Sequence, residues 1–142
     1  MKVIVAVVLT LLIVNAHSDH SAHSLTDEQL QIIEGHTTYC SEKSGIEIAD
    51  AKKIRFSVIE DADEKNQCFT KCFFEQTGFM DEEGNLKKEV MLEKLAKHKD
   101  EAITEKITKI IDECTLLEGD TICNKSFKIH NCYWSKVHPH PQ

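Results

Sequence analysis

The most regular pattern of hydrophobic and polar positions in the chain runs from Ala102 to Leu117. Its apolar residues recur about one helical turn apart, so they share one face of a helix with 3.6 residues per turn. They are Ile103, Ile107, Ile110, Ile111, Cys114 and Leu117. The pattern predicts an amphipathic helix with one buried face, and Gly119 is placed to end it.

Other segments also show helical rather than alternating patterns. They run from about Thr26 to Gly45, from Ile46 to Arg55, from Asp61 to Gln76, from Leu86 to Lys97 and over residues 121–134. No run alternates between apolar and polar residues as convincingly as a half-buried strand does. The two prolines both lie near the end of the chain, so neither interrupts these segments. The sequence therefore predicts an all-α domain of six helices.

Some of these helices have recognisable start signals. Thr26 and Gln29 form a capping box, in which each side chain accepts a hydrogen bond from the other residue's backbone N–H. Asp61, followed three residues later by Glu64, is expected to start the central helix. Asp120 is expected to cap the last helix.

The apolar positions of two less regular helices predict how each one packs. In the 46–55 segment and just beyond it they are Ile48, Ala51 and Val58. In the 86–97 segment they are Val90, Met91, Leu92 and Leu95. The first set lies roughly on one side of its helix. The second set covers a wide arc, which is typical of a well-buried helix.

Residues 1–16 resemble a secretory signal peptide rather than part of the fold. Lys2 precedes a nearly continuous apolar run that ends at Val14, and Val14 and Ala16 suit the −3 and −1 positions of a cleavage site. The run is shorter than the roughly 20 residues that span a bilayer, which argues against a membrane anchor. We therefore expect a secreted chain without membrane insertion, in which residues 17–142 form one domain.

Charge excludes some classes of partner. The full chain has a formal net charge of −7, and removal of Lys2 with the signal peptide makes the mature chain more negative still. An acidic protein of this size is a poor ligand for nucleic acid and for anionic membranes.

The two ends of the mature chain are expected to lie outside the helices. Residues 17–24 form a flexible lead with three histidines, which could bind copper or zinc if ordered, although a frayed terminus is the simpler interpretation. Residues 135–142 form a tail that cannot be helical throughout, because it contains Pro139 and Pro141.

Six cysteines in a secreted chain predict three disulfides. A zinc site would favour closer spacing and a reducing compartment. Cys68 and Cys72 lie four apart on one helix, which places them poorly for bonding to each other. Cys123 and Cys132 lie nine apart on another helix and face opposite sides. Excluding both pairs still leaves ten of the fifteen pairings open.

No catalytic constellation is visible. The cysteines are committed to disulfides, and the sequence contains no G-x-S-x-G turn, H-E-x-x-H motif or P-loop. His36 and His98 are more simply surface or partly buried histidines than catalytic groups. We therefore expect no enzyme activity, no cofactor and no metal site.

The chain is rich in apolar residues and has little polar machinery for catalysis. Six helices held by three disulfides can keep an apolar cavity open, because the disulfides replace part of the stabilisation from a packed core. An ordinary packed core explains the same residues, and on the residues alone it is the simpler interpretation.

The cysteine spacing C-x27-C-x3-C-x41-C-x8-C-x8-C resembles that of insect odorant-binding proteins of the general and pheromone-binding family. The resemblance covers Cys40 to Cys132, and the segments 72–75 and 92–95 also resemble fly members. The family pairs its first cysteine with the third, the second with the fifth and the fourth with the sixth. The implied disulfides are Cys40–Cys72, Cys68–Cys123 and Cys114–Cys132.

The resemblance implies a secreted carrier that binds small hydrophobic ligands, such as odorants or pheromones, in a cavity and delivers them to chemosensory receptors. The expected ligands are volatile alcohols, esters, aldehydes or fatty acids. The implied ligand-binding residues are Phe69, Phe73, Phe79, Met91, Leu92, Leu95, Ile107, Ile111, Phe127 and Trp134. A homodimer is a further partner to test for. The alternative is a lipid or amine carrier in saliva, haemolymph, gut or seminal fluid. The remaining alternatives are a secreted effector without a cavity and a small enzyme, for which turnover of lipid esters is the test.

The tail after Cys132 is expected to act as a lid over the cavity. Tyr133 and Trp134 would form its apolar base, and His138 and His140 would gain charge on acidification and weaken ligand binding. A disordered tail without a role is the alternative.

Overall fold

The computed structural model describes residues 25–138, which form six α-helices. They are α1 (Asp27–Ser44), α2 (Ile48–Phe56), α3 (Glu64–Thr77), α4 (Lys88–Leu95), α5 (Glu101–Cys114) and α6 (Ile122–Val137). Within these residues the only β-type pairing is an isolated bridge between Met80 and Leu86. The all-α prediction is confirmed. The expected signal peptide, the lead at 17–24 and the last four residues lie outside the described range.

The first helix begins and ends where the sequence indicates. The Thr26 hydroxyl accepts from the Gln29 backbone N–H at 3.2 Å, and the Gln29 side chain accepts from the Thr26 N–H at 3.0 Å. At the other end Gly45 adopts a left-handed conformation, with φ of 69°, and its N–H bonds back to the last turn. Both ends of α1 are therefore satisfied by local side-chain and backbone groups.

Several predicted boundaries are wrong by one to three residues. Asp63, not Asp61, caps α3, because its carboxylate accepts from the Asn66 N–H at 2.9 Å. Thr121, not Asp120, caps α6 by accepting from the Asn124 N–H. Helix α4 is shorter than the predicted segment at both ends, and α6 continues past residue 134 to Val137.

The predicted faces of α2 and α4 also need correction. The buried side of α2 is formed by Ala51, Ile54 and Arg55, whereas Ile48 is 41% exposed and Val58 lies beyond the helix. In α4 only Met91 is buried, so this helix is not enclosed on all sides. It packs against α5 and leaves its remaining apolar side chains partly exposed.

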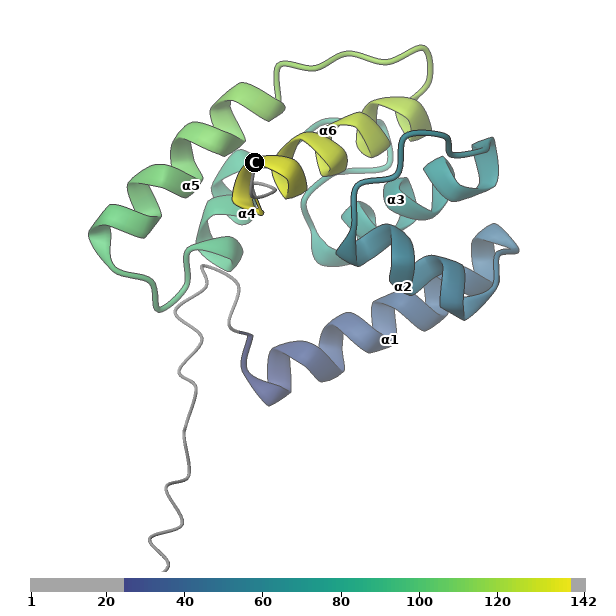
Figure 1. Cartoon of the computed structure of the whole chain (residues 1–142), viewed down its shortest axis with the longest axis horizontal. Coiled ribbons are helices and arrows are strands. Elements are labelled where there is room, and N and C mark those ends of the chain that lie inside the picture. The colour runs from purple at the N-terminus through teal and green to yellow at the C-terminus, as the bar shows by residue number, and fades with distance from the viewer. Residues whose placement is uncertain (1–24, 139–142) are drawn as a thin grey trace, which may run out of the picture.

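Helices α3 and α6 form the centre of the molecule, where α6 crosses beside α3 (Figure 1). On one side α3 contacts α1 and α2, and on the other α6 contacts α5, which in turn contacts α4. Figure 1 shows α4 and α5 together at the end of the molecule away from α2. The fold thus has two groups of outer helices joined through a central pair.

The core is divided into three clusters rather than one continuous block. The first contains Cys40, Ala51, Ile54, Phe69, Cys72 and Phe127; the second contains Phe74, Met80, Ile110, Cys114 and Ile129; the third contains Met91, Ile107 and Ile111. Phe73 packs against the first two clusters and Phe79 against the last two. These two rings therefore lie where the clusters meet.

Three disulfides tie the helices together, with pairs Cys40–Cys72, Cys68–Cys123 and Cys114–Cys132. Their Cα–Cα distances are 5.6, 4.5 and 5.6 Å, which suit disulfide geometry. The pairing is the one that the family resemblance implies. It joins α1 to α3, α3 to α6 and α5 to α6, so each bridge involves the central pair.

Candidate functional site

An apolar cavity of about 180 Å³ lies between α1, α2, α3, α4 and α6. Its lining is dominated by aromatic and aliphatic side chains, with few polar groups. The lining residues are Leu25, Ile33, Arg55, Phe56, Phe73, Phe74, Phe79, Met91, Leu95, Ile129, His130, Tyr133 and Trp134. A cavity of this kind, lined mainly by apolar side chains with a few placed polar groups, is typical of small-molecule sites.

Half of the ligand-binding residues implied by the resemblance line this cavity. They are Phe73, Phe79, Met91, Leu95 and Trp134. They come from α3, the connection after it, α4 and α6, so the cavity brings together residues far apart in the sequence. As lining residues, they remain candidates for direct ligand contact.

The other five implied residues lie outside the cavity wall and pack in the core instead. Phe69 is only 1% exposed and, like Phe127, belongs to the cluster around the Cys40–Cys72 disulfide. Ile107 and Ile111 are buried against Met91 between α4 and α5, and Leu92 packs on the same cluster. Since α5 contributes nothing to the cavity lining, its regular apolar face serves packing.

Sequence reasoning missed the part of the wall contributed by α1 and the residue before it, by α2, by the middle of α6 and by one ring of α3. The missed residues are Leu25, Ile33, Arg55, Phe56, Phe74, Ile129, His130 and Tyr133. Tyr133 had been expected to contact the cavity only as the base of a lid. The unusual signal in this set is a charged residue, Arg55, at the buried face of a short helix.

Arg55 is held in place at the cavity wall. Its side chain is 8% exposed, and its Nη1 donates to the Thr37 hydroxyl at 2.7 Å. The guanidinium lies 4.3 Å from the Phe56 ring centre and 5.4 Å from the Phe73 ring centre. Burial lowers the pKa of Arg55 to about 10, against the attraction of the Glu34 carboxylate. The group therefore remains a cation at neutral pH.

Two further polar groups face the cavity from α6. Burial lowers the pKa of His130 to about 4, against hydrogen bonds with the Arg55 backbone and the Asn131 side chain that raise it. The His130 imidazole is therefore neutral at physiological pH. Burial also raises the pKa of Tyr133, so its phenol stays protonated.

The end of α6 closes one side of the cavity. The Trp134 ring lies 6.1 Å from the Phe56 ring and 4.1 Å from the His138 ring, centre to centre. These contacts join Trp134 to α2 and to the end of its own helix. Whether Tyr133 and Trp134 form the base of a lid stays a prediction. Residues 139–142 and His140 lie outside the described range, so the pH-dependent lid stays a prediction.

A model of the PBP/GOBP family matches residues 22–136, which include every residue of the cavity. The chain belongs to this family of insect odorant-binding proteins. It is similar to Odorant-binding protein 10 of Aedes aegypti, with 31% identity over 128 residues that cover 89% of this chain and 87% of that protein. It is also similar to the B2 protein of Tenebrio molitor, with 30% identity over 112 residues covering 79% and 84%.

Among solved structures, the chain is similar to the fatty acid binding protein OBP56a from the oral disk of the blowfly Phormia regina. The TM-score is 0.65 at 29% sequence identity, and the match covers 79% of this chain and 94% of that one. The match supports the PBP/GOBP fold, and the family is one of small hydrophobic ligand carriers.

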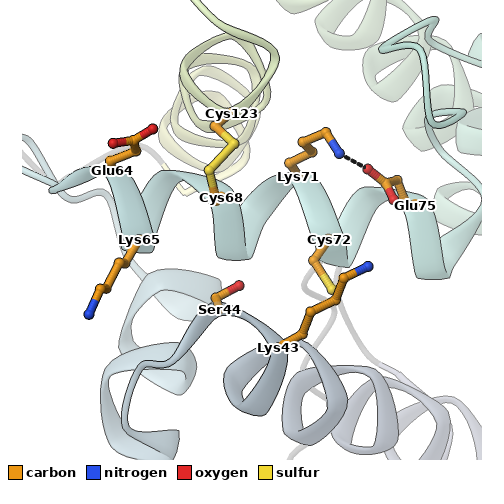
Figure 2. Close-up of a pocket in the computed structure, with 9 residues that line it drawn as sticks. All are labelled: Lys43, Ser44, Glu64, Lys65, Cys68, Lys71, Cys72, Glu75 and Cys123. Atoms are coloured by element: carbon orange, nitrogen blue, oxygen red, sulfur yellow. Dashed lines mark hydrogen bonds and ion pairs between the residues drawn. A yellow bond between two sulfur atoms is a disulfide. The ribbon is translucent and has the colours of Figure 1, made fainter.

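This member of the PBP/GOBP family also has a larger hollow of about 410 Å³ beside two of its disulfides. Figure 2 shows the hollow between α1 and α3, with Cys68 and Cys123 bonded at one side and Lys71 paired with Glu75. Its rim is lined mostly by lysine and glutamate side chains. Charged groups in contact with solvent do not exclude water, so the smaller apolar cavity is the better ligand site.

The part of the PBP/GOBP chain that the structure describes has no helix long and apolar enough to cross a membrane. The same residues contain no cluster of three or more histidine, cysteine, aspartate or glutamate side chains suited to a metal ion. Their cysteines are all in disulfides. What the cavity offers chemically is apolar contact, one cation and a few hydrogen-bonding atoms.

Proposed function

We propose that the protein is a secreted carrier that takes up odorants or pheromones in the cavity and delivers them to chemosensory receptors, without performing a reaction. The observation that carries the proposal is an apolar cavity with only a few polar groups in its wall, in a family of small hydrophobic ligand carriers. Secretion follows from the signal peptide expected at residues 1–16.

A lipid carrier outside olfaction is the second candidate. It is favoured by the similarity to a structure described as a fatty acid binding protein from an oral disk. The two candidates share the cavity and differ in tissue and in receptor contact, so localisation of the transcript in antennae or in mouthparts separates them.

Binding in the cavity is tested by the fluorescence of N-phenyl-1-naphthylamine with protein collected from the medium of cells that express residues 1–142. The purified chain should begin at His17. Met91→Trp should weaken probe binding by roughly tenfold or more, because overfilling a packed site costs about 1–3 kcal/mol. Medium-chain apolar compounds should displace the probe from the unaltered protein.

The matched control is Leu116→Trp, which adds the same ring at a position that is 74% exposed and outside the cavity. It should leave probe binding unchanged, and circular dichroism should show the same helix content in both variants. Equal probe affinity in Met91→Trp and the unaltered protein would mean that the ligand binds elsewhere.

A further inference from the structure

The sequence contains a single acceptor motif for N-linked glycosylation, Asn124-Lys125-Ser126. Such a motif consists of asparagine, any residue except proline, and then serine or threonine. No other asparagine of the chain has serine or threonine two positions later. Because so short a motif also arises by chance, the surroundings of Asn124 in the structure have to show that a glycan fits there.

Asn124 lies in the first turn of α6, which begins beside α3 (Figure 1). Its side chain is partly exposed and lines a hollow of about 440 Å³. The carbonyl oxygen Oδ1 accepts from the Asp120 N–H at 3.3 Å, and the amide nitrogen Nδ2 donates to Gln67 Oε1 at 3.5 Å. The second bond is long for a hydrogen bond, so Nδ2 is the more weakly held atom. A glycan is attached to Nδ2 and leaves it one N–H, so the folded chain can keep both bonds.

The hollow beside Asn124 has the mixed lining that suits a sugar. Its wall combines charged and amide side chains with one leucine and one phenylalanine. The lining residues are Glu60, Gln67, Leu117, Glu118, Asn124, Phe127, Lys128 and Asn131. N-acetylglucosamine, the first sugar of an N-glycan, has hydroxyl and acetamide groups for hydrogen bonds and an apolar methyl group. Both kinds of surface in the hollow therefore have a counterpart on the sugar.

The hollow also borders an exposed apolar surface just after α5. Leu117 lines the hollow and is 37% exposed, and Leu116 beside it is 74% exposed. Apolar side chains in contact with water are unfavourable, whereas a glycan is bulky and solubilising. A glycan on Asn124 would therefore cover part of this leucine surface and present hydroxyl groups to solvent in its place.

Ser126 determines when a glycan can be added. Its side chain is 0% exposed, and its hydroxyl donates to the Ile122 carbonyl at 2.7 Å. A transferase has to reach the serine of the motif together with the asparagine, which folded α6 does not allow. Transfer therefore has to precede the folding of α6. The disulfide between Cys68 and Cys123, the residue before Asn124, then fixes this turn to α3 (Figure 2).

We propose that Asn124 is an N-glycosylation site and that the first sugar of the glycan occupies the hollow beside it. The oligosaccharide comes from a lipid-linked pyrophosphate donor of the secretory pathway. A bond forms between Asn124 Nδ2 and the anomeric carbon of N-acetylglucosamine, the bond from that carbon to the pyrophosphate oxygen breaks, and the amide nitrogen loses one proton. The lipid pyrophosphate is the leaving group. The inference goes beyond ligand binding and rests on the secretion that the proposed function includes.

The alternative is that Asn124 serves only the first turn of α6, through its bond with the Asp120 N–H. Ser126→Ala separates the two roles, because it removes the acceptor motif and leaves Asn124 in place. The hollow and the apolar cavity share no lining residue, so the glycan and the ligand occupy separate sites.

The experiment measures the intact mass of protein secreted by insect cells that express residues 1–142, before and after treatment with a peptide N-glycosidase. The unaltered chain should begin at His17 and carry one N-glycan. The enzyme should remove the glycan and convert Asn124 to aspartate. Ser126→Ala should be secreted without a glycan and bind N-phenyl-1-naphthylamine as tightly as the unaltered protein. The matched control, Asn66→Gln, changes an asparagine of α3 outside the motif and should keep the glycan.

A secreted chain with the mass of unmodified residues 17–142 would overturn the inference and leave the carrier function intact. A glycan that persists in Ser126→Ala would do the same. Weaker probe binding by Ser126→Ala would contradict the placement of the sugar away from the cavity. If that variant is not secreted, conversion of Asn124 to aspartate in the unaltered protein decides. An unaltered chain that stays in the cytosol overturns both the inference and the secreted carrier.

Discussion

At the scale of single residues, only a few polar side chains line the cavity, so each of them has a large effect on its electrostatics. Arg55 is charged, while His130 and Tyr133 are held neutral by burial. Protonation of His130 would place a second cation close to Arg55 in surroundings that solvate charge poorly. The protonation state of His130 therefore affects the stability of the folded chain.

We predict that His130 makes the protein less stable on acidification. Its pKa is about 4 when folded and 6.5 in the unfolded reference. The unfolded chain therefore binds the proton first, so stability is complete above about pH 6.5 and is lost as pH falls toward 4. The contribution is on the order of 2 kcal/mol. Urea unfolding at pH 7 and pH 4.5 should show a smaller loss for His130→Gln.

The control is His98→Asn, which changes a solvent-exposed histidine on the connection after α4. Its loss of stability between the two pH values should equal that of the unaltered protein. If His130→Gln also matches the unaltered protein, His130 is not desolvated as described.

At the scale of elements, the connection between α3 and α4 positions Phe79 in the cavity. Asp81 organises this turn by accepting from the backbone N–H groups of Glu83 and Asn85, each at 2.9 Å. These hydrogen bonds, chiefly those from Asn85, lower the pKa of Asp81. The bridge between Met80 and Leu86 then closes the turn.

Gly84 is the most constrained position of this turn, and we predict that Gly84→Ala destabilises the protein by about 1–3 kcal/mol. Its φ of 87° disfavours any side chain, and a Cβ would lie 3.0 Å from the Ile122 side chain of α6. Gly35→Ala is the control, because Gly35 lies on an exposed part of α1 with nothing within 4 Å of a Cβ. That variant should gain about 0.5–1 kcal/mol. Thermal unfolding with intact disulfides measures both changes.

Local signals in the sequence predict the helices well and the cavity less well. The capping box at Thr26 and the apolar face of α5 depend on neighbouring residues alone, so their patterns identify these helices. Which apolar residues face the cavity depends on how helices pack. Phe69 and Phe73 lie four apart on α3, yet Phe69 is enclosed in the core while Phe73 reaches the junction of clusters.

The most regular apolar face was also the least informative about ligand binding. Ile107 and Ile111 lie on it and pack against α4. Arg55, in contrast, was hidden in a weak helical pattern, and only the packing of α2 on α1 shows that it is buried. A buried arginine cannot be told from an exposed one by periodicity alone.

At the scale of the whole molecule, the disulfides hold three core clusters around a space that none of them fills. Each bridge is expected to stabilise the fold by roughly 2–4 kcal/mol through its effect on the unfolded chain. That stabilisation offsets the packing lost at the cavity. The molecule can therefore keep an unfilled apolar space that a single continuous core of this size would close.

The central claim is that the ligand occupies this apolar cavity, and the fluorescence of Trp134 tests it most directly. Trp134 is the only tryptophan in the chain and lines the cavity. Bromine quenches tryptophan at close contact, so 2-bromodecanoate and 10-bromodecanoate probe the two ends of a bound chain. At least one should quench Trp134 with saturation at one equivalent, and 1-decanol should reverse the effect. Probe displacement by both acids without any quenching would place the ligand elsewhere and contradict the account.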